Sequence, residues 1–280
     1  MSNNKMPLVS VIMCEYNTDS IKLKKAINSI LNQTYSNIEF IIVDDGSKTN
    51  VKSIISSIND SRIRLIQNKC NKGFVYSLNK AIDSSSGDYL LRMDTDDIST
   101  NNRLEILMNF LLKNSQYAAV GSRALEFSDD DEKEDPMFSQ KKYIVIGKKG
   151  EKTKKDIMHN NTVIHATALF KKQALLDIGK YKNYYRCEDF VLWCELCING
   201  YKTYSLDDIL YYYRVNIDDY NKRKLKKRIQ SIKAIINYYP KLNASVSDYF
   251  YLIKIILSGT LPNKLVAKIR MHKYGIKRDM

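Results

Sequence analysis

The segment Gly87-Asp88-Tyr89-Leu90-Leu91-Arg92-Met93-Asp94-Thr95-Asp96-Asp97 decides the fold of this chain. Its residues 89–93 are typical of a buried strand, and acidic residues begin where that strand ends. Residues 38–43 form a second such run, which ends at the turn sequence Asp44-Asp45-Gly46-Ser47. In doubly wound sheets, ligands bind outside the carboxyl ends of the strands, so both acidic groups are expected at a ligand site.

Strand patterns alternate with helical patterns through the first half of the chain. The expected strands are residues 8–13, 38–43, 63–66, 89–93 and about 118–121. Apolar strands separated by helices indicate an α/β fold with a mostly parallel sheet covered by helices on both faces. Further on, residues 162–170 and 209–215 read as strands. The acidic stretch 128–135 and the basic stretch 141–155 read as solvated loops, which opposite charge pairs loosely.

The positive charge of the chain is concentrated near its end. The 280 residues carry a formal net charge of +14, but residues 221–280 hold 15 Lys and Arg against 2 acids, which leaves +1 for residues 1–220. We therefore expect two parts, a near-neutral α/β domain over 1–220 and a basic helical tail over 221–280. A near-neutral body argues against a nucleic-acid partner.

The tail is expected to lie on an anionic membrane surface. Leu225, Ile229, Ile232 and Ile236 recur at helical spacing among basic residues, which predicts a basic amphipathic helix. Such helices suit the headgroup region of anionic membranes. The alternative is a helical subdomain whose apolar face packs on the body.

The remaining global features favour a cytoplasmic protein, peripheral on the inner face of the plasma membrane. Residues 1–7 are polar and lack the pattern of a secretory signal. The longest dense apolar run, residues 249–257, is far shorter than the roughly 20 residues of a membrane-spanning helix. Five cysteines, an odd number, fit reduced thiols.

The acidic group after residues 89–93 has the composition of a metal site. Asp94, Asp96 and Asp97 would repel one another unless a cation or hydrogen-bond donors satisfied them. Their oxygen atoms suit Mg²⁺ or Mn²⁺, which normally completes its shell with water and substrate phosphate. This composition favours a metal-held nucleoside diphosphate. The alternative is that Asp97 or Thr100 only caps the next helix and that Asp94 and Asp96 are solvated loop residues.

Five motifs in order resemble glycosyltransferase family 2, an inverting family with the GT-A fold. They are Val9-Ser10-Val11-Ile12-Met13 before Tyr16-Asn17, Val43-Asp44-Asp45-Gly46-Ser47, Gly73 before a helix, Gly87-Asp88-Tyr89 leading to Met93-Asp94-Thr95-Asp96-Asp97, and Glu188-Asp189-Phe190 with Leu192-Trp193. The resemblance spans residues 8–215 and is greatest to bacterial members that build capsular polysaccharide, exopolysaccharide or lipopolysaccharide.

The resemblance implies a role for each motif on the donor side. Tyr16 would stack on the base of the sugar nucleotide, Asp45 would hydrogen-bond the ring, and Asp44 would belong to the same pocket. Asp94 would contact the ribose or the metal, and Asp96 would coordinate the metal that bridges the diphosphate.

On the acceptor side, the resemblance implies that Asp189 is the general base and that Glu188 raises its proton affinity or orients the acceptor. Arg214 would reach the diphosphate. Where many relatives carry a His shortly afterwards, this chain has Val215-Asn216, so a third metal ligand is not expected there. For His165, a role near the acceptor and simple core packing are equally open.

Together these features predict a metal-dependent inverting glycosyltransferase. It would use Mn²⁺ or Mg²⁺ to move a hexose or N-acetylhexosamine from a UDP-sugar donor to a lipid-linked or growing surface glycan. The alternative is a non-catalytic, membrane-tethered module that binds nucleotides or carbohydrates.

Overall fold

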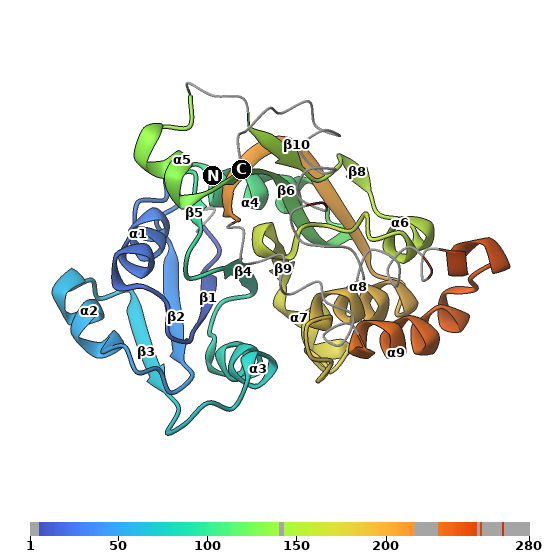
Figure 1. Ribbon diagram of the computed structural model, residues 1–280, viewed down its shortest axis with the longest axis horizontal. Helices are drawn as coiled ribbons and strands as arrows, with labels where there is room; N and C mark the ends of the chain where they lie inside the picture. Colours follow the sequence, from blue (N-terminus) through green and yellow to red (C-terminus); the bar gives the residue numbers. More distant parts are fainter. Residues whose placement is uncertain (1–5, 140–142, 216–228, 251–252, 254–264, 266–280) are drawn as a thin grey trace, which may run out of the picture.

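The computed structural model describes residues 6–139, 143–215, 229–250, 253 and 265. Helices flank a central twisted sheet on both faces (Figure 1). Within the described residues the strand order is β3-β2-β1-β4-β9-β6-β10-β5, with β7 beside β6 and β8 beside β10. This confirms the predicted α/β sheet flanked by helices.

The first half of the sheet is parallel, as predicted. Its members are β1 (Val9–Glu15), β2 (Ile38–Asp44), β3 (Ile63–Gln67) and β4 (Tyr89–Met93). Val9 is in register with Ile38 on one side and with Tyr89 on the other. The carboxyl ends of these four strands therefore meet at one edge of the sheet.

The second half of the sheet is mixed. The strands are β5 (Ile98–Ser99), β6 (Tyr117–Phe127), β7 (Ile144–Ile146), β8 (Gly150–Glu151), β9 (Leu169–Lys171) and β10 (Lys202–Arg214). Strand β9 is antiparallel to both β4 and β6, whereas β10 is parallel to β6. Strand β10 also begins earlier than the predicted strand over 209–215.

The predicted strand over 162–170 is wrong in its first part, which contains the 3-10 helix η1 (His165–Thr167). The Thr167 hydroxyl lies 2.8 Å from the carbonyl oxygen of Ile164 and accepts a bond from the Ser122 amide at 3.0 Å. These local side-chain bonds take the place of a strand ladder.

Two helical layers cover the sheet. One face carries α1 (Ser20–Leu31), α2 (Val51–Ile58) and α4 (Arg103–Lys113). The opposite face carries α3 (Phe74–Ser84), α6 (Lys154–Met158), α7 (Lys172–Asp177), α8 (Glu188–Ile198) and α9 (Ile229–Tyr238). Leu90 of β4 packs on the α3 and α8 side, while Leu91 and Met93 pack on the α1 and α4 side. The side-chain alternation of β4 therefore also places Arg92 on the α3 and α8 side.

The acidic stretch 128–135 is a helix rather than the predicted loop. Helix α5 (Asp129–Glu134) begins with a capping box, in which Ser128 and Asp131 bond each other's backbone amides. Its carboxylates at Asp129 and Glu132 pair with Lys22 and Lys25 of α1 and with Arg214 of β10. That basic stretch contains β7, β8 and the start of α6, and residues 140–142 lie outside the described part.

The beginning of the basic tail packs on the body of the protein. Ala234, Ile235 and Tyr238 of α9 are buried in the same cluster as α8, and the Tyr238 hydroxyl donates to Glu195 at 2.6 Å. The chain continues through the 3-10 helices η4 (Pro240–Leu242) and η5 (Val246–Tyr249). Division of the chain at 220 stays a prediction, and Leu225 lies outside the described residues.

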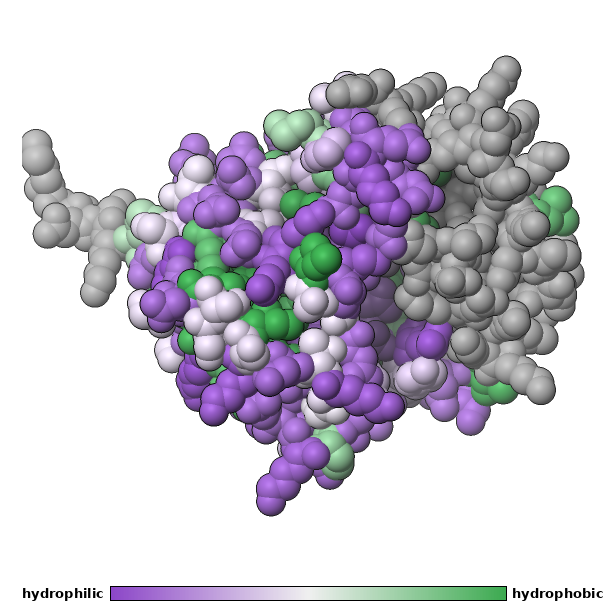
Figure 2. All heavy atoms as spheres, turned by 60° about the vertical axis from the view of Figure 1, so that its left-hand side comes forward, coloured by the Kyte–Doolittle hydropathy of each residue, from purple (hydrophilic) through white to green (hydrophobic). Residues whose placement is uncertain are grey.

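No helix among the described residues is both long and apolar enough to cross a membrane. The face on the α1 and α2 side, where it is described, is mainly hydrophilic with small separate hydrophobic areas (Figure 2). Exposed apolar side chains do occur in the tail, at Ile229, Ile236, Val246 and Phe250.

Candidate active site

The loops after β1, β2 and β4 form the candidate donor edge of the site. Because these strands are neighbours, the loops bring together Tyr16, Asp44, Asp45 and Asp94 at the carboxyl end of the parallel half. Tyr16 is 51% exposed, which leaves its ring accessible for stacking. The two aspartates after β2 are buried.

Asp45 holds the neighbouring loop through both of its carboxylate oxygens. Its Oδ1 accepts from the Asn68 side chain and the Lys72 amide, both at 2.8 Å, and its Oδ2 accepts from the Gly73 amide at 2.8 Å. Both oxygens of Asp45 therefore already accept hydrogen bonds. A bond from a nucleotide base would have to use one of these two occupied oxygens. Asp44 accepts from the Ser47 amide at 2.9 Å.

Gly46, in the turn after β2, has a backbone conformation that requires glycine. It has a φ of +75°, and a Cβ there would lie 2.6 Å from the backbone of Cys70. Any other residue would combine a left-handed conformation with a steric clash. The tight turn keeps the loop over residues 68–73 close to Asp45.

The acidic loop after β4 is held by the backbone and by two arginines. Asp94 pairs with Nη1 of Arg92, and its amide donates to the Tyr211 hydroxyl at 3.2 Å. Asp97 is buried, and its Oδ1 accepts from the Arg214 amide at 2.7 Å. Burial, with the charges of Asp94 and Asp96, raises the pKa of Asp97 well above its usual range.

The side chains of this loop fit a divalent cation by their donor chemistry. Asp97 Oδ2 is buried without a hydrogen-bond partner among the described residues, and three carboxylates lie within electrostatic reach of one another. A cation would relieve that repulsion. The described residues contain no group of three His, Cys, Asp or Glu side chains arranged around one metal. A site at Asp94 and Asp96 would thus need ligand oxygens from the substrate.

Arg214 lies beneath this loop and is held by the protein through Nη1 and Nε, whereas its Nη2 is buried with no hydrogen-bond partner among the described residues. Its side chain is 1% exposed, and its Nη1 pairs with Asp129 at 2.6 Å and with Glu132 at 2.9 Å. Its Nε donates to the carbonyl oxygen of Asp96 at 2.6 Å. Arg214 therefore connects helix α5 to the backbone that carries Asp96, and these contacts compete with a bond to a diphosphate.

Glu188 and Asp189 stand in the first turn of α8. They lie on the same face of the sheet as Arg92, whose charge acts on both carboxylates. Burial raises the pKa of each, and Asp189 Oδ1 accepts from the Phe190 amide at 2.7 Å. A carboxylate with a raised pKa is a stronger proton acceptor, so Asp189 is suited to the role of general base.

His165 lies behind this pair in an aromatic cluster. Its Nε2 is 2.7 Å from the Tyr181 hydroxyl, and its ring meets Trp193 edge-on at 6.5 Å. Burial lowers the pKa of His165 well below its usual range, so the ring is neutral at physiological pH. His165 therefore packs in the aromatic cluster with Tyr181 and Trp193. Its role near the glycosyl acceptor stays a prediction.

Sequence reasoning missed two charged residues that belong to the site, Arg92 and Glu15. Glu15 ends β1, is fully buried, and has an Oε2 without a hydrogen-bond partner among the described residues. Burial raises the pKa of Glu15, and the charges of Asp44 and Asp96 raise it further. Arg92 interrupts an apolar strand and Glu15 ends one, and a charge at such a position was the available signal.

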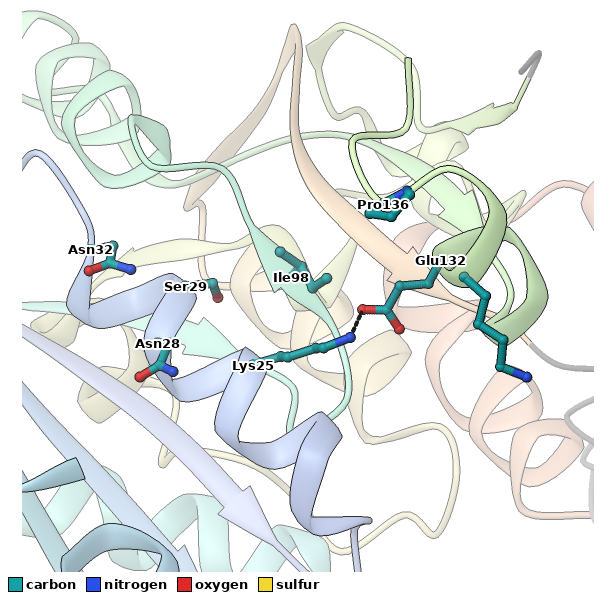
Figure 3. A pocket seen from close by; sticks show the side chains of 8 residues that line it. Lys25, Asn28, Ser29, Asn32, Ile98, Glu132 and Pro136 are labelled. Carbon is teal, nitrogen blue, oxygen red and sulfur yellow. Dashed lines mark hydrogen bonds and ion pairs between the residues drawn. The ribbon is translucent and has the colours of Figure 1, made fainter. Parts of the chain in front are cut away.

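A polar pocket lies apart from these residues, between α1, β5 and α5 (Figure 3). Lys25 of α1 reaches across its mouth to Glu132 of α5, with 2.7 Å between the charged atoms. The other lining residues are Asn28, Ser29, Asn32, Ile98, Lys133 and Pro136. None of the predicted site residues lines this pocket.

The arrangement defines a class. A half-parallel sheet with acidic loops at its carboxyl edge, faced by a carboxylate pair at a helix N-terminus, is that of GT-A glycosyltransferases. The chain belongs to glycosyltransferase family 2, because the profile described as "Glycosyl transferase family 2" matches residues 10–179.

Relatives and solved structures agree with this assignment. The chain is 31% identical to the glycosyltransferase EpsE of Bacillus subtilis, over 99% of this chain and 96% of EpsE. It is 29% identical to the Escherichia coli "UDP-Gal:alpha-D-GlcNAc-diphosphoundecaprenol beta-1,3-galactosyltransferase", over 87% of each. The mannosyltransferase PcManGT of Pyrobaculum calidifontis, solved with GDP-Man and Mn²⁺, superposes with a TM-score of 0.65 at 15% identity, over 98% of this chain and 82% of that one. The last likeness shows the fold alone.

Proposed function

We propose that this glycosyltransferase is a metal-dependent inverting enzyme that moves a hexose or N-acetylhexosamine from a UDP-sugar to a lipid-linked glycan. The observation that carries the proposal is the pairing of two acidic groups on one side of the sheet. Asp94 and Asp96 follow β4, and Glu188 and Asp189 begin α8, whose apolar side chains share a core cluster with Leu90 of β4.

The carboxylate of Asp189 performs the central step. It accepts the proton of the acceptor hydroxyl as that oxygen attacks the anomeric carbon from the side opposite the leaving group, which inverts the configuration. Burial raises the pKa of Asp189, so the carboxylate is more basic than one in water. The neighbouring Glu188 orients the acceptor.

The donor nucleotide binds at the loops after β1, β2 and β4. Tyr16 stacks on the base, Asp44 and Asp45 lie in the base pocket, and Asp94 and Asp96 hold the cation. A bound Mn²⁺ or Mg²⁺ stabilises the negative charge on the departing nucleoside diphosphate. UDP is favoured over GDP because the Escherichia coli relative, which is similar over most of both chains, is named for UDP-Gal.

The acceptor is proposed to be a lipid-linked sugar, as in the name of that relative. Such an acceptor lies at a membrane, and the basic tail over 221–280 supplies a surface for docking there. Ile229 and Ile236 of α9 are 51% and 55% exposed and lie seven residues apart, on one side of the helix. The residues proposed to dock are thus those of the predicted apolar stripe.

The direct test is release of UDP from UDP-sugars with Mn²⁺ and a lipid-linked N-acetylglucosamine acceptor. Asp96→Ala and Asp189→Ala are each expected to reduce kcat by at least roughly a hundredfold, the usual scale of such catalytic groups. Asp83→Ala is a matched control, because Asp83 is an exposed aspartate on α3 that pairs with Lys180. Wild-type rates in either site variant would overturn the assignment.

A further inference from the structure

Arg92 is a buried cation that the proposed reaction leaves without a role. It is the fourth residue of β4, and its side chain is 5% exposed. Its Nη1 pairs with Asp94, and its guanidinium carbon lies 5.5 Å above the centre of the Phe74 ring of α3. Its Nε is buried with no hydrogen-bond partner among the described residues. Unpaired buried nitrogens also occur at Arg103, Arg123, Arg186 and Arg214. Arg92 differs from them because it pairs with Asp94 of the acidic loop and its charge also acts on Glu188 and Asp189, so its free donor is the one placed to bind an oxygen atom of the substrate.

The surroundings of Arg92 indicate where that oxygen atom comes from. Asp94 belongs to the end of the proposed site that holds the metal and the ribose. Glu188 and Asp189 belong to the other end, where the general base acts. The charge of Arg92 acts on all three carboxylates, so its guanidinium lies within electrostatic reach of both ends. In a single displacement the donor sugar lies between its diphosphate and the general base, since the oxygen of the glycosyl acceptor attacks opposite the leaving group. A group within electrostatic reach of both ends is therefore placed to reach the sugar.

The alternative acceptor, a diphosphate oxygen, is less well matched. Asp94 already offsets the charge of Arg92 through their ion pair, whereas a diphosphate calls for excess positive charge, which the proposed cation at Asp96 provides. Neutral hydroxyl oxygens of a sugar need directed N–H donors without excess charge. The unpaired Nε supplies such a donor.

We propose that Arg92 is a specificity-determining residue that donates hydrogen bonds to the sugar ring of the donor. This inference rests on the proposed function. It predicts that Arg92 distinguishes a UDP-sugar from UDP, and one UDP-sugar from another, while it contributes little to binding of the nucleotide itself.

The experiment compares Arg92→Met with the wild type in two assays. The first measures kcat/KM for UDP release with UDP-glucose, UDP-galactose, UDP-N-acetylglucosamine and UDP-N-acetylgalactosamine. The second measures the Kd of UDP with Mn²⁺ by calorimetry. We expect kcat/KM for the preferred sugar to fall roughly ten- to hundredfold, the loss of one or two bonds to a charged donor, and the preference among sugars to narrow. The Kd of UDP with Mn²⁺ should rise by a smaller factor than kcat/KM falls, because the variant removes the ion pair with Asp94 but no direct contact to UDP.

Two further variants keep the test decisive. Arg62→Met is the matched control, because Arg62 also pairs with an aspartate, Asp60 at 2.8 Å, just before β3 at the opposite end of the sheet, and its kinetics should not change. If Arg92→Met does not fold, Arg92→Lys keeps the charge beside Asp94 but removes Nε, and the same loss of kcat/KM with unchanged UDP binding is expected.

Each contrary result has a distinct meaning. An unchanged kcat/KM, or an equal loss in the affinity for UDP, would overturn the role of Arg92 and leave the glycosyl transfer standing. A wild-type protein that releases UDP from none of the four sugars would instead overturn the proposed donor, and the role of Arg92 with it.

Discussion

Asp189 is half-buried in the first turn of α8, and its ionisation has consequences for both activity and stability. Burial is the largest cause that raises the pKa of Asp189 above its ordinary value. The base acts when ionised, so we expect the acid side of the pH profile of kcat/KM to lie above the pKa of an ordinary aspartate. A profile that falls only at the pKa of a solvated carboxylate would contradict this role.

The same shift predicts that Asp189→Asn stabilises the protein. A folded-state pKa raised above the unfolded value gives stability that is present at low pH and is lost as pH rises through the folded pKa. At about pH 7, therefore, the ionised carboxylate of the wild type costs stability, and Asn removes that cost. We expect a higher thermal midpoint for the variant at neutral pH, and a smaller difference as the pH falls.

Asp60 is the control, because its pKa is shifted in the opposite direction from that of Asp189. Its hydrogen bond with Arg62 is the largest cause that lowers the pKa of Asp60, so its contribution is present at neutral pH and is lost as pH falls through the folded pKa. Asp60→Asn should lower the thermal midpoint at neutral pH. Shifts of the same sign in both variants would show that burial does not govern Asp189.

At the scale of single residues, the sequence predicted the aspartates better than their partners. Asp94 and Asp96 are visible because acidic residues follow an apolar strand. The charge at Arg92 was also visible, but the alternation of side chains along β4 predicts only the face of the sheet on which Arg92 lies. That Arg92 meets Asp94 on one side and Phe74 on the other depends on the packing of α3, which no local pattern encodes.

At the scale of elements, helix α5 is predicted to position the metal-binding loop. Asp129 and Glu132 hold Nη1 of Arg214, and Nε of Arg214 holds the carbonyl oxygen of Asp96. In the variant Asp129→Asn with Glu132→Gln, the buried guanidinium loses both charged partners. We expect the Mn²⁺ concentration for half-maximal activity to rise by roughly tenfold, since supporting groups around metal sites have effects of that order.

Asp130→Asn is the matched change on the same helix. Asp130 is 84% exposed and contacts Lys133 at 3.4 Å, so its loss leaves Arg214 untouched. Circular dichroism and thermal melts of both variants separate a shift in metal dependence from unfolding. An unchanged Mn²⁺ requirement in the folded double variant would show that α5 does not act on the loop.

Helix α5 also illustrates why some elements could not be predicted. Residues 128–135 are so acidic that they read as a solvated loop, and the helix carries no apolar stripe from which a period could be found. What stabilises it are its capping box and the cations of α1 and β10, which lie more than 80 positions away from the helix along the chain. The parallel strands were predictable because burial on both faces makes them apolar throughout.

At the scale of the whole molecule, the tail divides into a packed side and a free side. Helix α9 buries Ala234, Ile235 and Tyr238 against α8, so removal of the chain after 220 would expose the core. A truncation therefore cannot isolate membrane docking from folding. Point variants on the free side can do so.

We expect Ile236→Asp with Phe250→Asp to reduce cosedimentation with phosphatidylglycerol vesicles several-fold, because both side chains are more than half exposed and a charge in the headgroup region opposes insertion of an apolar face. Binding of UDP should not change, since neither residue belongs to the loops after β1, β2 and β4. Leu112→Asp is the matched control, because Leu112 is 51% exposed on α4, on the opposite face of the sheet. Equal vesicle binding by the double variant and the control would place membrane contact elsewhere on the protein. Loss in the double variant alone would show that these apolar side chains contact the membrane, and weaker binding of the wild type at high salt would show that the positive charge also contributes.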